Sequence, residues 1–565
     1  MFSRLCLIAP IALVMAACGG GEGDPVFTPP GSNSVPIAAA DTARIRPGMP
    51  ADIDVLDNDR DGDGDDLTIE LPAAHASATF EVVASRLRVT PAAGFGGTLT
   101  FSYRVRDSHG AYSAPANVVV DVGPIARALM VLAPAPSATP PVGSPRFVVA
   151  GTPSDDPLEL LTFGTCNQQS WAYLTSDARR LLGRSCLSPT RSDIFLSQPR
   201  ATTLTSPTLV YGNAPLASGL VILGNFAEFL VAERVSNPDV LTLGSTYDLV
   251  RVDIVQGTVM QRMPLTGIDH VSLVRPGGPR RVLLVARDTN GDQGHFIADI
   301  DAGTVRRVTP PEDIDIESSM LSPNGRYLVS NWPLPAEIIG YDTEGPVQRQ
   351  TLWTVPDSSP LSYVTNMQFI AGPAATLLVE SMNLATRETV VWRVPLATPE
   401  EAREVVRFTA GPVHLRMLVR DGVGVYGADG GSGRTHLNRV DIFTGEILEP
   451  LTPSGGAAIE SVDWFTGTTL LFTMRDDGQT RRGAWIRTDA PGVVRIVAPT
   501  LEAELFSLSI DQEETTIGLR APNASGVTSG WLVDVNLPSM AFPVASALQP
   551  GEVVSMVQSL GPPDP

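Results

Sequence analysis

The sequence predicts an all-β protein that combines a small β-sandwich with a large β-propeller of seven or eight blades, eight being slightly favoured. Three observations lead to this fold class. Gly (51) and Pro (49) are abundant without a collagen-like period, which is typical of many short strands joined by turns. Apolar and polar residues alternate over 99–105 and 117–122, as in half-buried strands. Beyond residue 146, a weak repeat of about 47 residues supplies four short strands per unit.

Residues 1–18 have the layout of a signal peptide. One arginine precedes an apolar run over 5–15, and this run is too short to span a bilayer as a permanent helix. The final Met15-Ala16-Ala17-Cys18 resembles the lipobox of bacterial lipoproteins, which usually begins with Leu where this chain has Met. The resemblance implies a lipid on Cys18, and Gly19 after it implies sorting to the outer membrane. The alternative is an ordinary signal peptide with an incidental cysteine.

The rest of the chain divides by composition. Residues 19–36 are rich in Gly, Pro and Ser and are expected to form a flexible tether. We expect the β-sandwich over 37–123, a Pro-rich linker over 124–145 and the propeller over 146–565.

Two stretches of the sandwich segment carry a family resemblance. Residues 55–69 read VLDNDRDGDGDDLTI, and residues 97–110 read GTLTFSYRVRDSHG. Together they resemble the cadherin-like and immunoglobulin-like (Ig-like) tandem-repeat domains of bacterial surface proteins. The resemblance covers about 85 residues and implies a sandwich in which both stretches belong to one domain.

The first of these stretches is strongly acidic and predicts a metal site. Six aspartates fall within ten residues, and only Arg60 opposes them. Ca²⁺ takes six to eight oxygen ligands, and alternation of Asp with Gly lets a loop fold its side chains round one ion. We therefore expect a structural Ca²⁺ site, with ligands drawn from Asp57, Asp59, Asp61, Asp63 and Asp65 and from Asp107 in the second stretch. The alternative is a solvated acidic turn that binds no ion.

The propeller segment contains two recurring elements. One is a strand that ends at a turn, at residues 253, 299, 342, 395, 441, 488 and 534. The other is a strand-turn-strand element, whose clearest copy is MLSPNGRYLV at 320–329. This copy resembles the hairpins of TolB-like and prolyl-oligopeptidase-type propellers. Eight blades follow if 553–560 closes the ring against 146–150, and seven if 146–216 is an insertion.

Cys166 and Cys186 are the two cysteines outside the export segment. In an oxidising compartment, two thiols at this spacing more often form a disulfide than a catalytic pair. The residues between them lack the clustered Cys and His of a zinc site. We therefore expect a disulfide between Cys166 and Cys186.

The sequence offers no residue that can be named as catalytic. It contains no Gly-x-Ser-x-Gly, His-Glu-x-x-His or phosphate-loop motif. His270, His295, His414 and His436 lie at the ends of expected strands. His295 and His436 are expected at equivalent repeat positions, which favours a role in blade geometry.

Net charge and the predicted export set the expected function. The formal net charge of −21 repels phosphate backbones, so nucleic acid is not expected as a partner. We expect a lipoprotein held in the outer membrane by its lipid, whose propeller binds an envelope protein, a peptide or a glycan. The alternatives are a propeller lyase or hydrolase with its site at the channel mouth, and a purely structural surface protein.

Overall fold

The computed structural model describes residues 33–564 except 94, 135–144, 152–156, 163–170, 176, 189, 224–226, 237–243, 277–280, 312–318, 333–336, 357–361, 371–374, 411–414, 430–433, 454–455, 476–479, 502–507, 524, 545–547 and 549–551. Within these residues one helical segment occurs, the 3-10 turn η1 (Pro399–Glu401). None of the described helical residues forms a helix long and apolar enough to cross a membrane.

The N-terminal module, residues 33–123, is a β-sandwich. One sheet has the order β1-β7-β6-β3 and the other β2-β5-β4. Along β6, every second side chain is buried, because successive side chains point to opposite faces of a strand. The strands are β1 (Asp41–Ile45), β2 (Ala51–Ile53), β3 (Thr68–Glu70), β4 (Ala78–Val83), β5 (Arg86–Pro91), β6 (Gly97–Arg106) and β7 (Ala116–Val122). The predicted sandwich is confirmed.

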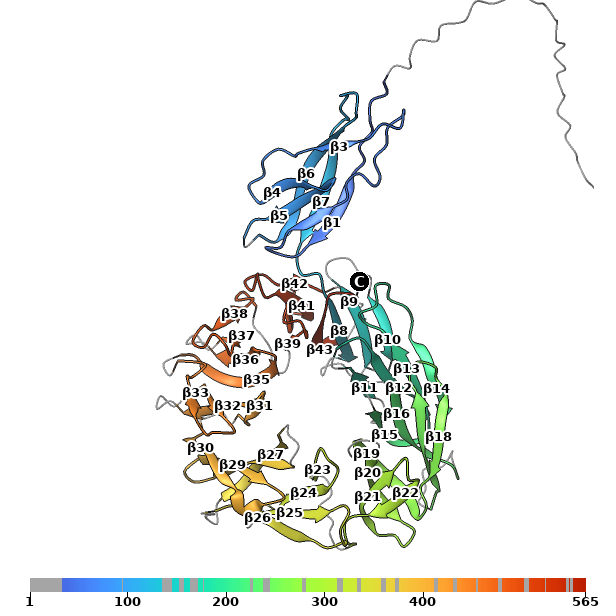
Figure 1. Cartoon of the computed structure of the whole chain (residues 1–565), viewed down its shortest axis with the longest axis vertical. Coiled ribbons are helices and arrows are strands. Elements are labelled where there is room, and N and C mark those ends of the chain that lie inside the picture. The colour runs from blue at the N-terminus through green and yellow to red at the C-terminus, as the bar shows by residue number, and fades with distance from the viewer. Residues whose placement is uncertain are drawn as a thin grey trace, which may run out of the picture.

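The second part of the chain is a β-propeller. Its described strands form nine four-stranded sheets, arranged as blades round a ring (Figure 1). The first four blades are β43 (Glu552–Gly561) with β8 (Arg127–Pro134), β9 (Arg146–Gly151) and β10 (Leu158–Thr162); β11 (Trp171–Leu174), β12 (Leu181–Ser188), β13 (Arg191–Ser197) and β14 (Thr208–Ala214); β15 (Leu216–Leu223), β16 (Glu228–Arg234), β17 (Tyr247–Asp253) and β18 (Val259–Pro264); and β19 (Ile268–Pro276), β20 (Arg281–Asp288), β21 (Gln293–Asp299) and β22 (Thr304–Arg307).

The remaining blades follow in chain order. They are β23 (Met320–Leu321), β24 (Tyr327–Trp332), β25 (Glu337–Asp342) and β26 (Gln350–Thr354); β27 (Ser362–Phe369), β28 (Thr376–Asn383), β29 (Glu388–Pro395) and β30 (Arg403–Thr409); β31 (Leu418–Arg420), β32 (Val423–Asp429), β33 (Thr435–Asp441) and β34 (Ile447–Leu448); β35 (Ala458–Thr466), β36 (Thr469–Arg475), β37 (Arg481–Arg487) and β38 (Arg495–Val497); and β39 (Ser509–Ile510), β40 (Thr516–Pro522), β41 (Thr528–Asp534) and β42 (Phe542–Pro543).

Turns with one chemistry explain why the repeat is visible in the sequence. Three blades end their third strand in Asp, with a Gly four residues later, at Asp253, Asp299 and Asp441. The carboxylate of Asp441 accepts the backbone N–H groups of Phe443 and Thr444, both at 2.8 Å. Gly445 has a φ of +78°, a conformation that is costly for residues with a Cβ. The Asp and the Gly together therefore fix the turn to the fourth strand.

The expected blade number of seven or eight is wrong, because the structure describes nine blades. The missed blade, β11–β14, lies within 146–216, the segment expected to be an insertion if the ring had seven blades. The turn after β13 reads Gln198-Pro199-Arg200 and has neither the Asp nor the Gly of the recurring turn. The recurring turn residues therefore gave no indication of its strands.

Ring closure also differs from the expectation. The last strand, β43, pairs antiparallel with β8, and β8 then pairs with β9. The segment 124–145, expected to be a linker, thus contains a propeller strand. The expectation of a linker rested on the high proline content, although the apolar residues 128–133 precede most of the prolines. The ring is closed by a blade that joins strands from the two ends of the propeller.

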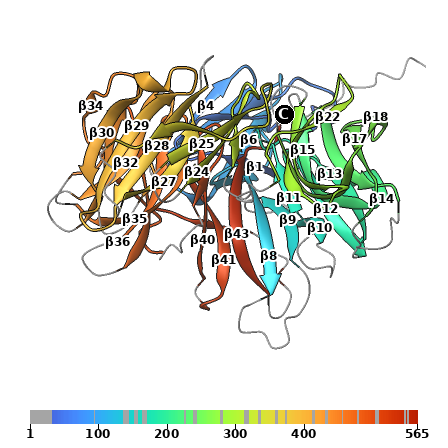
Figure 2. The same cartoon turned by 90° about the horizontal axis from the view of Figure 1, so that it is seen from below.

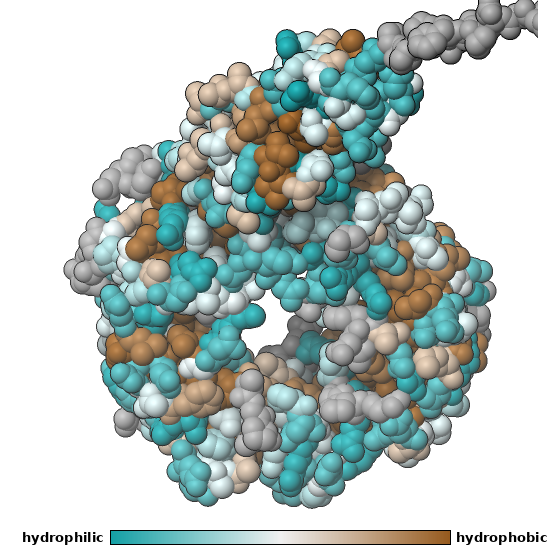
Figure 3. Space-filling view, turned by 45° about the horizontal axis from the view of Figure 1, so that its top comes forward, coloured by the Kyte–Doolittle hydropathy of each residue, from teal (hydrophilic) through white to brown (hydrophobic). Residues whose placement is uncertain are grey.

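The module continues outward from the rim of the ring. Figures 1 and 2 show it beside the ring and not above either face, with the blade of β39–β42 next to it. The first strand of each blade faces the centre, except in the closing blade, where β43 does (Figure 1). Figure 3 shows an opening through the centre of the ring. The propeller therefore has a central channel with two mouths.

Candidate functional site

A cavity of about 360 Å³ lies at one mouth of the central channel, where innermost strands of five blades end. These strands are β11, β31, β35, β39 and β43. Most lining residues are hydrogen-bonding or small: Leu174, Thr175, Ala178, Arg420, Thr466, Ile510, Asp511, Gln512, Gln558 and Ser559. Neither a histidine nor an aromatic residue is among the described lining residues. The cavity is of the size at which small-molecule sites begin.

Two charged residues line the cavity, and they differ in how they are bound. Asp511 is 2 % exposed, and its carboxylate accepts the backbone N–H and the hydroxyl of Thr515, both at 2.7 Å. Burial raises the pKa of Asp511. Arg420 is 45 % exposed, and among the described residues its guanidinium has one loose contact, with Nε 3.9 Å from a carboxylate oxygen of Asp421. The carboxylate is therefore committed to the turn, whereas the guanidinium is available to a ligand.

A buried serine also lines the cavity. Ser559 is 2 % exposed, and its Oγ has no hydrogen-bond partner among the described residues. Its backbone N–H donates to Ser509 Oγ at 2.9 Å. Because this oxygen is buried as well as unpaired, it is costly to the fold and is not presented to a ligand.

At the opposite mouth, the charges near the strand starts are already paired. Three of the innermost strands carry an acid near their first residue, and each acid binds an arginine of its own blade. The pairs are Arg146–Glu552 at 2.7 Å, Arg287–Asp269 at 2.7 Å and Arg475–Glu460 at 2.6 Å. The two mouths therefore offer different chemistry to a ligand.

The histidines that the sequence places at strand ends do not form a common site. Nε2 of His295 lies 2.6 Å from Ser319 Oγ, and Nδ1 of His270 lies 3.4 Å from the hydroxyl of Tyr247. His414 lies outside the described residues. One metal-suited group of three side chains occurs among the described residues, and it contains no histidine.

The expected equivalence of His295 and His436 is wrong by one residue. The backbone N–H of His295 donates to Thr309 Oγ1 at 2.9 Å, and the corresponding bond in the blade of β31–β34 runs from Leu437 to Thr452 Oγ1 at 2.9 Å. His295 therefore corresponds to Leu437. A shift of one residue turns a side chain to the other face of a strand, so His436 and His295 point to opposite faces of their blades.

The metal-suited group lies in the acidic loop of the module. One carboxylate oxygen from each of Asp61, Asp63 and Asp65 lies within 4.8 Å of the others. Asp61 Oδ1 accepts the N–H groups of Asp63 at 2.8 Å and Asp65 at 3.3 Å. Asp61 Oδ2 is buried and has no hydrogen-bond partner among the described residues. Carboxylate oxygens in such a loop are suitable Ca²⁺ ligands.

The other three expected ligands are not in this group. Asp59 accepts the hydroxyl of Tyr103 at 2.9 Å. Asp107 accepts Asn33 Nδ2 at 2.7 Å and the N–H groups that follow it in its turn. Although desolvation acts to raise it, these hydrogen bonds lower the pKa of Asp107. Asp57 is exposed outside the group. Three of the six expected ligands therefore lie close enough together to hold one ion. Because Ca²⁺ takes six to eight oxygen ligands, water would have to supply the others.

His109 contacts the acidic loop, and the sequence analysis did not identify it. Its Nδ1 lies 2.7 Å from Asp65 Oδ2, and this contact raises the pKa of His109. His109 could have been found from the sequence, because it lies two residues after Asp107 in the stretch expected to meet the acidic loop. A cation at the loop would compete with His109 for the same carboxylate.

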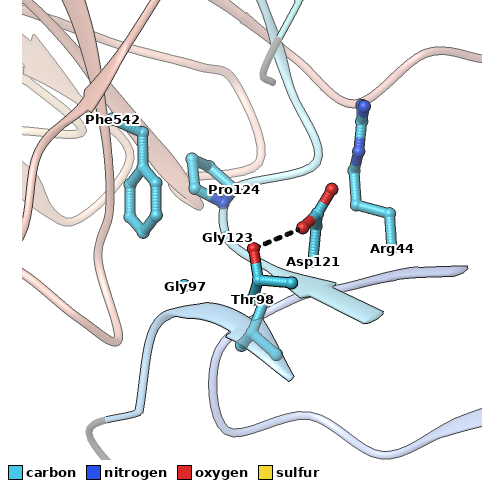
Figure 4. Close-up of a pocket in the computed structure, with 8 residues that line it drawn as sticks. Arg44, Gly97, Thr98, Asp121, Gly123, Pro124 and Phe542 are labelled. Carbon is cyan, nitrogen blue, oxygen red and sulfur yellow. Dashed lines mark hydrogen bonds between the residues drawn. The ribbon is translucent and has the colours of Figure 1, made fainter. Parts of the chain in front are cut away.

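The joint between module and propeller contains a second cavity, of about 190 Å³. Figure 4 shows Phe542 of the propeller beside Pro124 and Gly123, with the bonded pair Thr98 and Asp121 on the module side. A Cβ built on Gly96 would lie 2.7 Å from Leu537 Cδ2, and one on Gly123 would lie 3.1 Å from Phe542. The glycines thus allow the last blade to pack closely against the module.

A buried ion pair also crosses the joint. Arg46 Nε and Nη2 of the module both lie 3.3 Å from Asp534 Oδ2 of the propeller, and the side chain of Asp534 is 0 % exposed. In two other blades the equivalent turn aspartate binds an arginine of its own blade, Asp299 with Arg281 and Asp342 with Arg326. The joint is therefore built from packing and charge together.

Some of the expected site residues cannot be compared with the structure. Cys18 and Cys166 lie outside the described residues. Cys186 is disulfide-bonded, and its pairing with Cys166 remains a prediction.

Residues 33–121 match the family model described as a bacterial Ig domain. The N-terminal module is an Ig-like domain. No curated protein is similar enough to this sequence to count as a match.

Among solved structures, several resemble the chain at low similarity. TolB from Acinetobacter baumannii is 12% identical, with 82% of this chain and 96% of that chain covered and a TM-score of 0.27. A structure described as the eukaryotic initiation factor is 10% identical, with 67% and 85% covered and a TM-score of 0.41. The dihydro-heme d1 dehydrogenase NirN in complex with DHE is 14% identical, with 65% and 73% covered and a TM-score of 0.37. At these scores the similarities carry no argument about function.

Proposed function

We propose that the protein is a lipoprotein of the outer membrane whose propeller is a binding platform for an envelope protein, a peptide or a glycan. The observation that carries the binding role is the channel-mouth cavity, whose described lining comes from several blades and consists mostly of small or hydrogen-bonding residues. Its one acid, Asp511, is bonded within its own turn. A general acid or base must reach the reacting atoms, so this lining supports binding ahead of catalysis.

The place of the Ig-like domain supports the same proposal. The first described residues lie at the end of the domain away from the ring, and the ring extends from the other end (Figure 1). With a lipid on Cys18, the domain would act as a spacer and hold the ring edge-on to the membrane. Both mouths of the channel would then remain open to a partner.

We further propose that the acidic loop of the Ig-like domain binds Ca²⁺ in a structural role. Asp61, Asp63 and Asp65 would hold the ion, with water completing its coordination. The bound ion would offset the repulsion between these carboxylates. The unpartnered Asp61 Oδ2 supports this assignment.

The anchor is tested by fractionation of the native cells. A Cys18→Ser variant cannot carry a thioether-linked lipid, so it should leave the membrane fraction or remain unprocessed. A variant that fractionates with the outer membrane as the wild type does would contradict the anchor.

The binding role is tested by cross-linking in native membranes, followed by purification of the anchored protein. We expect a defined partner that is recovered with the wild type and lost when the cavity is altered by Gln558→Arg. A matched control is Gln261→Arg in β18, an outer strand (Figure 1). Recovery of the same partners from all three proteins would contradict a platform at this mouth.

A further inference from the structure

The charged residues of the channel-mouth cavity differ in what they offer to a ligand. Arg420 and Asp511 are the charged residues among its described lining. Asp511 is buried and its carboxylate oxygens are bonded to Thr515, so they are not available to a ligand. Among the described residues, Arg420 has one loose contact, with Asp421, whose side chain is 89 % exposed. A guanidinium in this state is a ready partner for an anion, and its planar fork matches a carboxylate bidentately.

The other lining residues limit the charge of the anion. A phosphate carries up to two charges and is usually bound by several cationic groups or N–H donors, whereas one arginine is found among the described residues that line this cavity. The net charge of −21 also disfavours a dianion. A single carboxylate is therefore the anion that fits best.

The neutral walls indicate what the carboxylate is attached to. Gln512 and Gln558 each offer an amide donor and an amide acceptor, and Thr466 adds a hydroxyl. These groups match the alternating N–H and C=O groups of a peptide backbone. No aromatic residue is among the described lining residues, so the cavity lacks the flat apolar surface on which large ligands usually pack. Leu174 and Ile510 leave room for small apolar side chains.

We propose that this mouth of the channel binds the C-terminal end of a peptide, with the terminal carboxylate on Arg420 and the last peptide groups on Gln512 and Gln558. The inference rests on the proposed function, because it names the chemistry that the platform recognises. The ligand must therefore enter from the mouth at which β43 ends. The pairs Arg146–Glu552 and Arg475–Glu460 lie at the opposite mouth and take no part in its binding.

The test uses two probes that differ only in the charge of one end. N-acetyl-trialanine with a free carboxylate and the same peptide as its terminal amide are titrated into the mature protein by calorimetry. We expect the acid to bind at least tenfold more tightly than the amide, because hydrogen bonds to charged groups are worth about 1.5–3 kcal/mol. Raising the salt concentration should reduce this preference.

Variants separate the role of the arginine from general effects on the fold. In Arg420→Gln the preference for the acid should disappear, while Arg326→Gln, an exposed arginine of another blade, should behave as the wild type. Gln558→Leu should weaken both peptides by a few fold, because it removes the amide that binds the last peptide groups. Unchanged melting temperatures would show that these variants are folded.

The other outcomes overturn the inference. Equal binding of acid and amide, or a preference that survives in Arg420→Gln, would remove the carboxylate from the site. No binding of either peptide at millimolar concentration would remove the peptide. Binding of maltotriose in place of both peptides would identify a glycan site. Each of these results leaves the platform itself standing if the cross-linked partner depends on the same cavity.

Discussion

Aspartate has three physically different roles in this chain. In the recurring turns, as at Asp441, an exposed carboxylate accepts backbone N–H groups and fixes the turn. In the half-buried position of Asp59, a carboxylate accepts the hydroxyl of Tyr103, and desolvation raises its pKa. In the acidic loop, Asp61 keeps one oxygen without a hydrogen-bond partner among the described residues. The last role is the one that a cation would complete.

The acidic loop predicts that Ca²⁺ stabilises the Ig-like domain. An ion that binds the folded state alone adds RT ln(1 + [L]/Kd), about 2.7 kcal/mol at a hundredfold excess over Kd, and a domain of this size should melt several degrees higher. The measurement is calorimetry of the mature protein with Ca²⁺ and with a chelator. Asp61→Asn/Asp63→Asn should abolish the shift, while Asp57→Asn, outside the group, should retain it.

Two results would count against this site. Identical melting curves of the wild type in the two buffers would leave a solvated acidic turn. A shift that survives in the double variant would place the ion elsewhere.

Two histidines of the propeller, the half-buried His270 and the buried His436, predict a loss of its stability in mild acid. Burial, with the charges of Arg287 and Arg234, lowers the pKa of His270, and burial lowers that of His436. The unfolded chain, with histidine pKa values of about 6.5, therefore binds more protons than the folded chain. Stability is present above about pH 6.5 and is lost as the pH falls from there toward the folded pKa values.

The test compares urea unfolding at about pH 5.5 and about pH 7.5. The drop in midpoint at the lower pH should be smaller in His270→Gln/His436→Gln than in the wild type. His75→Gln, in the Ig-like domain, should leave the drop in the propeller transition unchanged. A double variant with the full drop would assign the effect to other groups.

At the scale of elements, the sequence predicts those parts whose local chemistry repeats. Blades with the Asp-and-Gly turn, such as β31–β34, stand out because turn geometry demands those residues. The blade β11–β14 lacks them, and its strands are held by pairing and packing that any apolar residues can supply. Ring closure by β8 and β43 joins segments more than 400 residues apart, and no local pattern encodes such a contact.

The candidate sites show the same division. The loop at Asp61, Asp63 and Asp65 could be predicted because its ligands are neighbours in sequence. The pairing of Asp59 with Tyr103 could not, because it depends on how β6 packs against the loop. The channel-mouth cavity, with Arg420 and Ser559, is formed by strands of five blades, so its members share no motif.

Ring closure predicts a large cost for one substitution. Arg146 of β9 binds Glu552 of β43, and the two side chains are 8 % and 4 % exposed. Arg146→Gln would leave the carboxylate of Glu552 buried without its cation, which typically costs about 3–5 kcal/mol. The measurement is the free energy of unfolding in urea. Arg407→Gln, whose pairs with Glu388 and Glu404 are exposed, should cost less than about 1 kcal/mol, and equal effects would contradict this account of closure.

At the scale of the whole molecule, the joint determines how the propeller is presented. The Ig-like domain leads directly into β8, the strand that closes the ring, and it packs against the turn before β42. That turn reads Asp534-Val535-Asn536-Leu537-Pro538 and lacks the glycine of the recurring turn. Its apolar residues instead face the glycines of the domain. In this blade, a turn that packs against the Ig-like domain thus replaces the recurring turn.

The joint predicts that the domain and the ring move as one body, and a small wedge should separate them. In Gly96→Ala the new Cβ would lie 2.7 Å from Leu537 Cδ2, closer than carbon atoms pack. The joint should open, and the radius of gyration from small-angle scattering should increase. Adding Leu537→Ala removes the clashing atoms and should restore the compact value. Phe443→Ala, an exposed aromatic in the equivalent turn of another blade, should change nothing, and a Gly96→Ala variant with the wild-type scattering curve would show that the joint yields without opening.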